Sequence, residues 1–193
     1  MYEFKDLQRL TLVASLLVGT QALLEFAGSA AALIQGPALA GEIRSAEWLQ
    51  IASAILLLAC IATVGRWIYL ASSNAHAFGP DMTITPGWAV GWYFVPFANL
   101  VKPFQAMREV WHASHESSGA YEERVPILGV WWGLWITSNI LSNIAWRLGD
   151  SSPAAAIDMV AAVLSVALAV VFIIIMREVD ESQRYVRHAI AFA

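Results

Sequence analysis

Cysteine and charge are both scarce in this chain, and each shortage excludes a class of protein. Cys60 is the only cysteine among 193 residues, so the chain has no internal disulfide framework or cysteine-based zinc site. Charged residues make up 13% and apolar residues 59% of the sequence, against about 25% and about 45–50% in soluble domains. The composition therefore predicts a membrane protein with a single helical domain over residues 1–193, in which Cys60 packs as a small hydrophobic residue.

The sequence also lacks the signatures of several kinds of site. No basic run suggests nucleic acid, and no glycine-rich phosphate loop or nucleophile motif is present. The four histidines, His76, His112, His115 and His188, all lie outside the predicted spans, which argues against haem. His112 and His115 share a helical face but have no defined third ligand. We therefore expect no catalytic residue, no metal site, no cofactor and no nucleic-acid partner.

Long apolar runs are what the chain has instead. About 20 apolar residues suffice to cross a bilayer as a helix, and four runs are long enough, at about 7–34, 48–70, 125–147 and 154–176. Polar links are predicted at 36–47, 71–83, 116–124 and 149–152, and Gly36-Pro37 is expected to end the first helix. Gly129 and Gly133 are spaced for close helix packing. A charged helical tail, 177–193, follows the last span, and Tyr185, Val186 and Ile190 are expected to rest on the membrane surface.

The stretch 86–114 is too broken for a span and too apolar for a loop. Thr85-Pro86 is typical of a helix start, and Pro96 then interrupts a short apolar helix. Lys102-Pro103 begins a second, amphipathic helix. These signals predict a helical hairpin that is hinged at 96–99 and is re-entrant or interfacial.

The polar and aromatic residues of this hairpin are our candidates for a lipid, partner or ligand site. Lys102 and Arg108 would meet lipid phosphates, or the broken helix ends would form a solute or ion site. The structural alternative is that Asn99 caps the break, Arg108 pairs with a carboxylate and the tryptophans mark the interface. The candidates are Trp88, Trp92, Pro96, Asn99, Lys102, Pro103, Gln105, Arg108, Glu109 and Trp111.

The distribution of lysine and arginine favours four spans over five. Basic residues accumulate on the cytoplasmic side of a membrane. Four spans with a returning hairpin place nine of them inside and two, Arg44 and Arg147, outside; five spans give seven against four. We therefore expect both termini in the cytoplasm. Non-helical backbone at the hinge would then need cover from protein or a wet cavity.

The same topology brings polar residues of three spans to a similar depth. We expect an intramembrane polar cluster near the external ends of these spans, unless each charge reaches headgroups and water separately. Its candidate members are Glu25, Asn139, Asn143, Arg147 and Asp158.

Two motifs resemble a bacterial family known as domain of unknown function family 4328. The first runs from Trp88 through Gly91-Trp92, Pro96 and Asn99 to Lys102-Pro103 and Trp111. The second runs from Gly129 through Trp131-Trp132-Gly133 and Trp135 to Ser138-Asn139. The resemblance implies a helical protein of the bacterial inner membrane, and it implies no activity, ligand or catalytic residue.

The sequence thus predicts an all-α membrane bundle of four spans plus the hairpin. We expect a non-enzymatic protein that acts through membrane lipids, another membrane protein or self-association at the hairpin. A small transporter or channel component is the first alternative. The second is a membrane enzyme on a lipid-like substrate, with Glu109 beside Arg108 as an acid–base pair.

Overall fold

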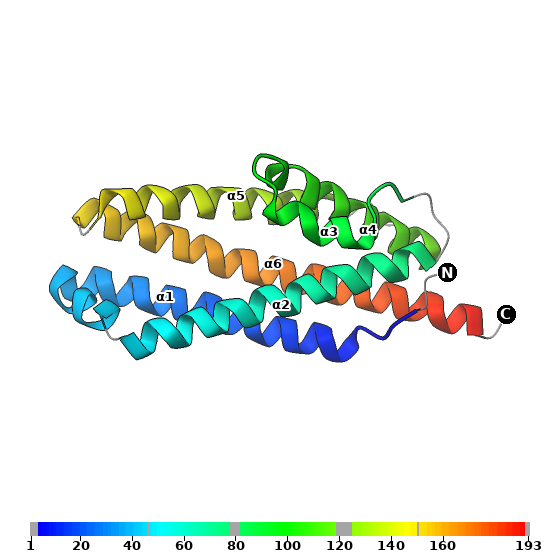
Figure 1. The fold of residues 1–193 in the computed structure, drawn as a ribbon, viewed down its shortest axis with the longest axis horizontal. Coiled ribbons are helices and arrows are strands. Elements are labelled where there is room, and N and C mark those ends of the chain that lie inside the picture. The colour runs from blue at the N-terminus through cyan, green and yellow to red at the C-terminus, as the bar shows by residue number, and fades with distance from the viewer. Residues whose placement is uncertain (1–3, 46, 78–81, 119–124, 150, 192–193) are drawn as a thin grey trace. The chain divides into compact units, whose positions relative to one another are not determined.

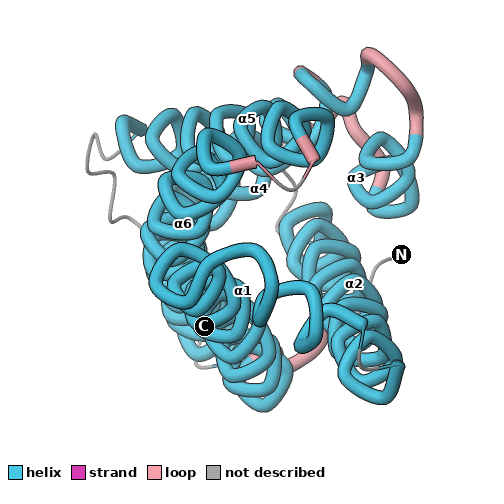
Figure 2. Tube along the Cα trace, turned by 90° about the vertical axis from the view of Figure 1, so that its left-hand side faces the viewer, coloured by secondary structure: helices cyan, strands magenta, loops and turns pink. Residues whose placement is uncertain are grey.

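Every regular element of the described chain is a helix, as Figures 1 and 2 show. The structure is a computed structural model and describes residues 4–45, 47–77, 82–118, 125–149 and 151–191. The all-α class is confirmed for these residues. The elements are α1 (Gln8–Ser45), α2 (Glu47–Ala77), α3 (Pro86–Gly91), the 3-10 turns η1 (Trp92–Phe94) and η2 (Ala98–Leu100), α4 (Lys102–Ser118), α5 (Val125–Leu148) and α6 (Ser152–Ala191).

Within the described residues, three helices are long and apolar enough to cross a membrane. The stretches are Gln8–Ile34 in α1, Gln50–Ala77 in α2 and Ser152–His188 in α6. The membrane character predicted from composition is therefore supported. The fourth predicted span, α5, has 24 residues but is not one of these three stretches. Its crossing of the membrane stays a prediction.

The helices continue through segments that we predicted to be links. α1 runs through Gly36-Pro37 to Ser45, so the predicted break there is wrong; a membrane helix tolerates proline where other groups satisfy the freed carbonyl. α2 continues to Ala77 and buries Ser72 and Asn74, although their polarity suggested a connector. α4 extends to Ser118. The turn signal at 79–81 and the loop 119–124 lie outside the described residues.

Local hydrogen bonds account for several helix ends. The Asp6 carboxylate accepts the Gln8 backbone N–H at 2.9 Å, satisfying a free donor at the start of α1. Ser151 Oγ accepts the Ala154 N–H at 3.3 Å and so caps the start of α6. Gly149 has a φ of 63°, a conformation that glycine adopts without strain, and it ends α5.

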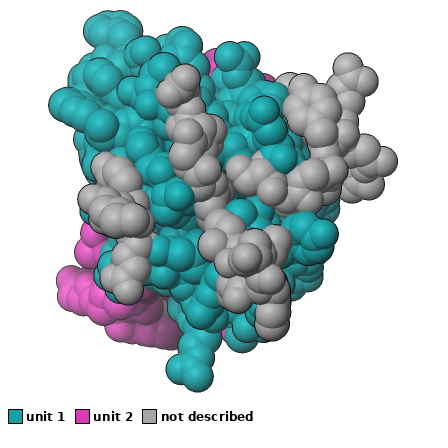
Figure 3. All heavy atoms as spheres, turned by 90° about the vertical axis from the view of Figure 1, so that its right-hand side faces the viewer, with its two compact units in different colours: residues 1–15, 62–129, 173–193 teal, residues 16–61, 130–172 magenta. Residues whose placement is uncertain are grey.

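The chain divides into two compact units, coloured in Figure 3. Unit 1 comprises residues 1–15, 62–129 and 173–193, and its interior includes Leu7, Trp67, Trp111 and Met176. Val186 is also buried in unit 1, so its predicted place on the membrane surface is wrong. Its neighbour Tyr185 is exposed.

Unit 2 comprises residues 16–61 and 130–172. Trp131 stacks on Phe172 with ring centroids 5.5 Å apart, and small residues such as Ala161 and Ala169 fill the remaining interior. A side chain added at Gly133 would meet no described group within 4 Å, and the same holds for Gly129 in unit 1. The predicted close-packing face is therefore not used within the described chain.

Candidate functional site

The predicted hairpin is built from α3, η1, η2 and α4, all of which belong to unit 1 (Figure 1). α3 begins at Pro86, whose fixed φ suits a first helical position. It packs against α2, because a Cβ added at Gly65 would lie 3.5 Å from Val90. The two 3-10 turns then reverse the chain into α4, which begins at Lys102 as expected.

The loop between α3 and α4 exposes large apolar side chains, while several of its backbone groups hydrogen-bond to one another. The exposed fractions are 71% for Phe94, 87% for Phe97, 48% for Leu100 and 52% for Val101. We call these four residues the hairpin tip. The Ala98 N–H donates to Pro96 O at 2.7 Å and the Asn99 N–H to Val95 O at 3.0 Å. The tip is thus apolar in its side chains and internally bonded in its main chain.

Phe97 holds an unusual backbone conformation at the centre of the tip. Its φ is 62°, the only positive value at a residue other than glycine in the described chain. A bulky residue in this region costs of the order of 1–3 kcal/mol. The fold therefore holds a phenylalanine outward at a position that would suit glycine better.

Aromatic and basic side chains meet at the base of the tip. Trp88 stacks on Trp92 with ring centroids 4.5 Å apart, and Lys102 Nζ lies 5.9 Å from the centroid of the Trp92 ring, within the range of a cation–π contact. Three predicted candidates, Trp88, Trp92 and Lys102, thus lie together.

Glu109 fastens the start of the hairpin to α4. Its carboxylate accepts the Thr83 N–H at 3.1 Å, the Ile84 N–H at 3.0 Å and the Thr83 hydroxyl. Thr85, the predicted cap, makes no side-chain capping bond, and the Glu109 carboxylate holds the two residues before it. The carboxylate therefore already has a structural role, which weighs against the acid–base pair with the exposed Arg108.

The remaining hairpin candidates divide between surface and interior. Pro103 and Trp111 are buried, and the Trp111 ring stacks on His115 with centroids 4.1 Å apart. Pro96 is exposed, whereas Asn99 and Gln105 are half-buried. Trp111 is thus part of the core of unit 1 and is not presented to a lipid or partner.

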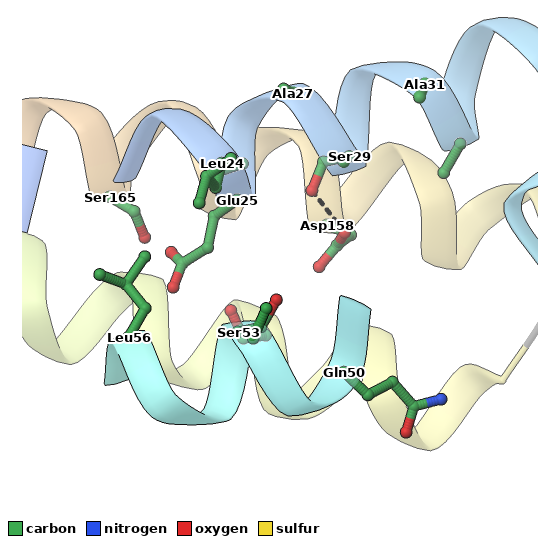
Figure 4. A pocket seen from close by; sticks show the side chains of 15 residues that line it. Leu24, Glu25, Ala27, Ser29, Ala31, Gln50, Ser53, Leu56, Asp158 and Ser165 are labelled. Atoms are coloured by element: carbon green, nitrogen blue, oxygen red, sulfur yellow. Dashed lines mark hydrogen bonds between the residues drawn. The ribbon is translucent and has the colours of Figure 1, made fainter. Parts of the chain in front are cut away.

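A second site is a cavity of about 870 Å³ within unit 2, lined by all four of its helices. Figure 4 shows the carboxylates of Glu25 and Asp158 pointing into this space, on the side opposite Ser53. Ser29 Oγ donates to Asp158 Oδ2 at 2.7 Å, and Gln21 Nε2 donates to Glu25 Oε1 at 2.8 Å. We call this space the carboxylate cavity.

The carboxylate cavity contains two of the five residues of the predicted polar cluster. Glu25 and Asp158 line it, and the other three do not. The Asn139 side-chain amide donates to Trp135 O at 2.7 Å and that of Asn143 to Asn139 O at 2.9 Å, both within α5. Arg147 is exposed at the end of the same helix. Asn139, Asn143 and Arg147 are spaced four residues apart, which places them on one face of α5. This spacing did not indicate that the asparagine amides would donate to backbone carbonyls of their own helix.

A buried polar network in unit 1 was missed in the sequence. The Asn74 amide exchanges two hydrogen bonds with the Lys5 backbone and donates to Gln183 Oε1 at 2.9 Å. Gln183 Nε2 donates to Ala71 O and to Ser114 Oγ, each at 3.0 Å. Asn74, Ser114 and Gln183 are each at most 1% exposed. No pattern in the sequence indicated the network, because Asn74 and Gln183 each stand alone among polar or charged neighbours.

Comparison with known proteins assigns the chain to a family. A family model described as Domain of unknown function (DUF4328) matches residues 30–181. The chain belongs to this family. The resemblance based on the two tryptophan motifs is therefore confirmed. The DUF4328 match includes the whole hairpin and Asp158, and it begins directly after Ser29.

No curated protein and no solved structure matches the sequence. DUF4328 is by its description a family of unknown function, so membership carries no activity to this chain. Together with the three apolar helices it is consistent with an integral membrane protein of unknown function. Function must therefore be inferred from the hairpin and the cavity themselves.

Proposed function

We propose that this protein is a non-enzymatic membrane protein that acts by contacting lipid acyl chains through the hairpin tip. The observation that carries the proposal is the outward placement of Phe94, Phe97, Leu100 and Val101. Apolar surface moved out of water gains about 25 cal/mol per Å². Lipid contact at this one tip would therefore offset the backbone strain at Phe97.

The backbone hydrogen bonds of the tip also favour a position within the bilayer. Non-helical backbone is tolerated at membrane depth only where its polar groups find partners. The turns between α3 and α4 supply several such bonds, including Leu100 N–H to Phe97 O at 3.3 Å and Val101 N–H to Ala98 O at 3.1 Å. Water is not needed to satisfy these donors.

The residues at the base of the hairpin indicate how the hairpin is oriented relative to the membrane. Tryptophan is enriched at the headgroup level, and basic side chains there attract anionic lipid. We place Trp88, Trp92 and Lys102 at this level on the cytoplasmic side of a bacterial inner membrane. The chain would then have four spans, a returning hairpin and both termini in the cytoplasm. The apolar tip then enters the bilayer and the polar face of α4 stays near the headgroups.

Site-specific fluorescence quenching tests the lipid contact. A bimane label is attached to Phe97→Cys in a Cys60→Ala background, and the protein is reconstituted into vesicles containing phospholipid with brominated acyl chains. We expect the bromolipid to quench this label and aqueous iodide not to, because the side chain would lie in hydrocarbon. The matched control is Glu116→Cys, an exposed position near the end of α4, where iodide should quench.

Two outcomes would overturn the proposal. Strong iodide quenching at 97 would mean that the tip stays in water. Quenching at 97 by neither agent would mean that protein covers the tip, which would favour a membrane-protein partner or self-association instead of lipid.

Transport is the second candidate, supported by the carboxylate cavity. A solute path would use carboxylates within the apolar helices, where ionisable groups often mark substrate routes. Lipid contact is the preferred function because it accounts for the strained, exposed tip. A solute flux into vesicles that requires Asp158 would favour transport.

A further inference from the structure

The carboxylate cavity is an open groove with the size of a small-molecule site. Pockets that hold such ligands typically measure about 300–1,000 Å³, and this one has about 870 Å³. Residues of α1, α2, α5 and α6 line it, all within unit 2. The site therefore depends on no contact between the two units.

The charges of the cavity have one sign. Glu25 and Asp158 both lie in the apolar stretches of α1 and α6, and no lysine, arginine or histidine is among the described residues that line the cavity. The hydrogen bonds from Gln21 and Ser29 come from neutral groups and supply no counter-charge. Two carboxylates in membrane-crossing helices are costly without a cation, so the cavity favours a positively charged ligand.

The rest of the lining narrows the kind of cation. Within the described residues, no group of three or more His, Cys, Asp or Glu is placed to hold a metal ion. The described lining residues include no aromatic ring, which weighs against a quaternary ammonium held by cation–π contacts. A protonated amine instead donates hydrogen bonds to carboxylates and serine hydroxyls. Ser53, Ser142 and Ser165 supply such hydroxyls in addition to Ser29.

The apolar residues that line the cavity indicate that the ligand also has an apolar part. Leu24 and Leu56 line the cavity together with several alanines, and in Figure 4 Leu56 lies beside Glu25. We propose that this cavity binds the primary ammonium group of an amphipathic amine, with Glu25 and Asp158 as its acceptors and the leucines and alanines around its apolar chain. This inference goes beyond lipid contact at the hairpin and is independent of it.

Calorimetric titration with octylammonium tests the site. The full chain in a non-ionic detergent is titrated with octylammonium, with octanol and with octyltrimethylammonium. Octanol has a similar chain without the charge, and octyltrimethylammonium has the charge without N–H donors. We expect saturable binding of octylammonium and at least about tenfold weaker binding of the other two, because each lacks half of the charge-assisted hydrogen bonding.

Variants locate the binding. Glu25→Gln with Asp158→Asn should weaken octylammonium binding at least about tenfold, whereas Glu47→Gln, which removes an exposed carboxylate of α2 outside the cavity, should leave it unchanged. If the double variant does not fold, Ser53→Leu provides the same test by filling the cavity without altering its charge. Equal binding by wild type and a folded cavity variant, or no saturable binding by wild type, would overturn the proposal.

A further arm identifies the source of the amine. The titration is repeated in nanodiscs of phosphatidylethanolamine and of phosphatidylcholine. Weaker octylammonium binding in phosphatidylethanolamine would assign the cavity to an aminolipid headgroup. Equal binding in both would assign it to a free amphipathic amine. An octylammonium signal that scales only with detergent or lipid and not with protein would refute the site.

Discussion

At the level of single residues, the interior of unit 1 depends on amides that satisfy one another. Asn74 and Gln183 connect α2 and α6, and through Lys5 and Ser114 they also hold the N-terminal segment and α4. A buried polar group without a partner costs about 1–3 kcal/mol. The network therefore stabilises unit 1 only while every member has its partner.

Gln183→Leu should destabilise the protein although leucine is apolar and of similar size. The change removes the acceptor of the Asn74 amide and the donor to Ser114. We expect a loss of about 2 kcal/mol, which corresponds to a fall in Tm of about 4–8 °C for a chain of this length. Thermal unfolding in detergent measures it.

The control for this change is Glu181→Leu, at an exposed position on the same helix. It should shift the Tm by much less, because it removes no buried hydrogen bond. Equal Tm values for Gln183→Leu and the wild type would show that the network contributes no net stability.

At the level of elements, the hairpin is anchored at its base and exposed at its tip. The base has the Glu109 carboxylate, the buried Pro103 and the buried Trp111. The tip carries short-range backbone hydrogen bonds, and its large apolar side chains are exposed. This division fits an element whose far end is covered by something other than its own chain.

Glu109→Ala should loosen the segment before α3. The Thr83 and Ile84 N–H groups lose their acceptor, and one lost hydrogen bond to a charged group is worth about 1.5–3 kcal/mol. We expect amide hydrogen exchange at these two residues to accelerate by about tenfold or more. Mass spectrometry or NMR in detergent measures the rates.

Glu116→Ala provides the comparison, since Glu116 is an exposed carboxylate on the same helix. Exchange at Thr83 and Ile84 should be unchanged in that variant. Similar exchange rates in the two variants would mean that the Glu109 carboxylate does not fasten the hairpin.

The positions of the helices could largely be predicted from the sequence. Apolar runs and the Thr85-Pro86 and Lys102-Pro103 signals predicted the helices and the starts of α3 and α4. The end of α1 was missed because Gly36-Pro37 indicated a break, and the end of α2 was missed because polarity at 72–74 indicated a link. The Asn74 side chain is buried because it has hydrogen-bond partners on other segments. A single sequence does not show which segments those are. Glu109 was a candidate, but its attachment to residues 83–84 depends on contacts 25 and 26 positions apart.

At the level of the whole molecule, helix length exceeds what a bilayer needs. A rise of 1.5 Å per residue makes the 40 residues of α6 about 60 Å long, against a hydrocarbon core of about 30 Å. The 38 residues of α1 likewise exceed the core. Parts of these helices must therefore extend beyond the hydrocarbon, and accessibility from each side of the membrane becomes a measure of topology.

The four-span topology predicts which helix ends share a side. Single cysteines at Ala77, Glu116, Glu47 and Ser152, in a Cys60→Ala background, are exposed to a membrane-impermeant maleimide in intact cells. The first two positions end α2 and α4, and the other two begin α2 and α6; all four are exposed. We expect labelling at 47 and 152 and protection at 77 and 116 until the membrane is opened.

The decisive pair is 77 and 116, because the segment between them crosses the membrane only in the five-span alternative. Same-side labelling requires the hairpin to return, as the excess of basic residues predicts. Opposite-side labelling would refute the hairpin and turn the strained loop at Phe97 into a break within a fifth span. Asn74, also near the end of α2, is fully buried. Ala77, one turn further along α2, keeps the same topological meaning and is exposed to the reagent.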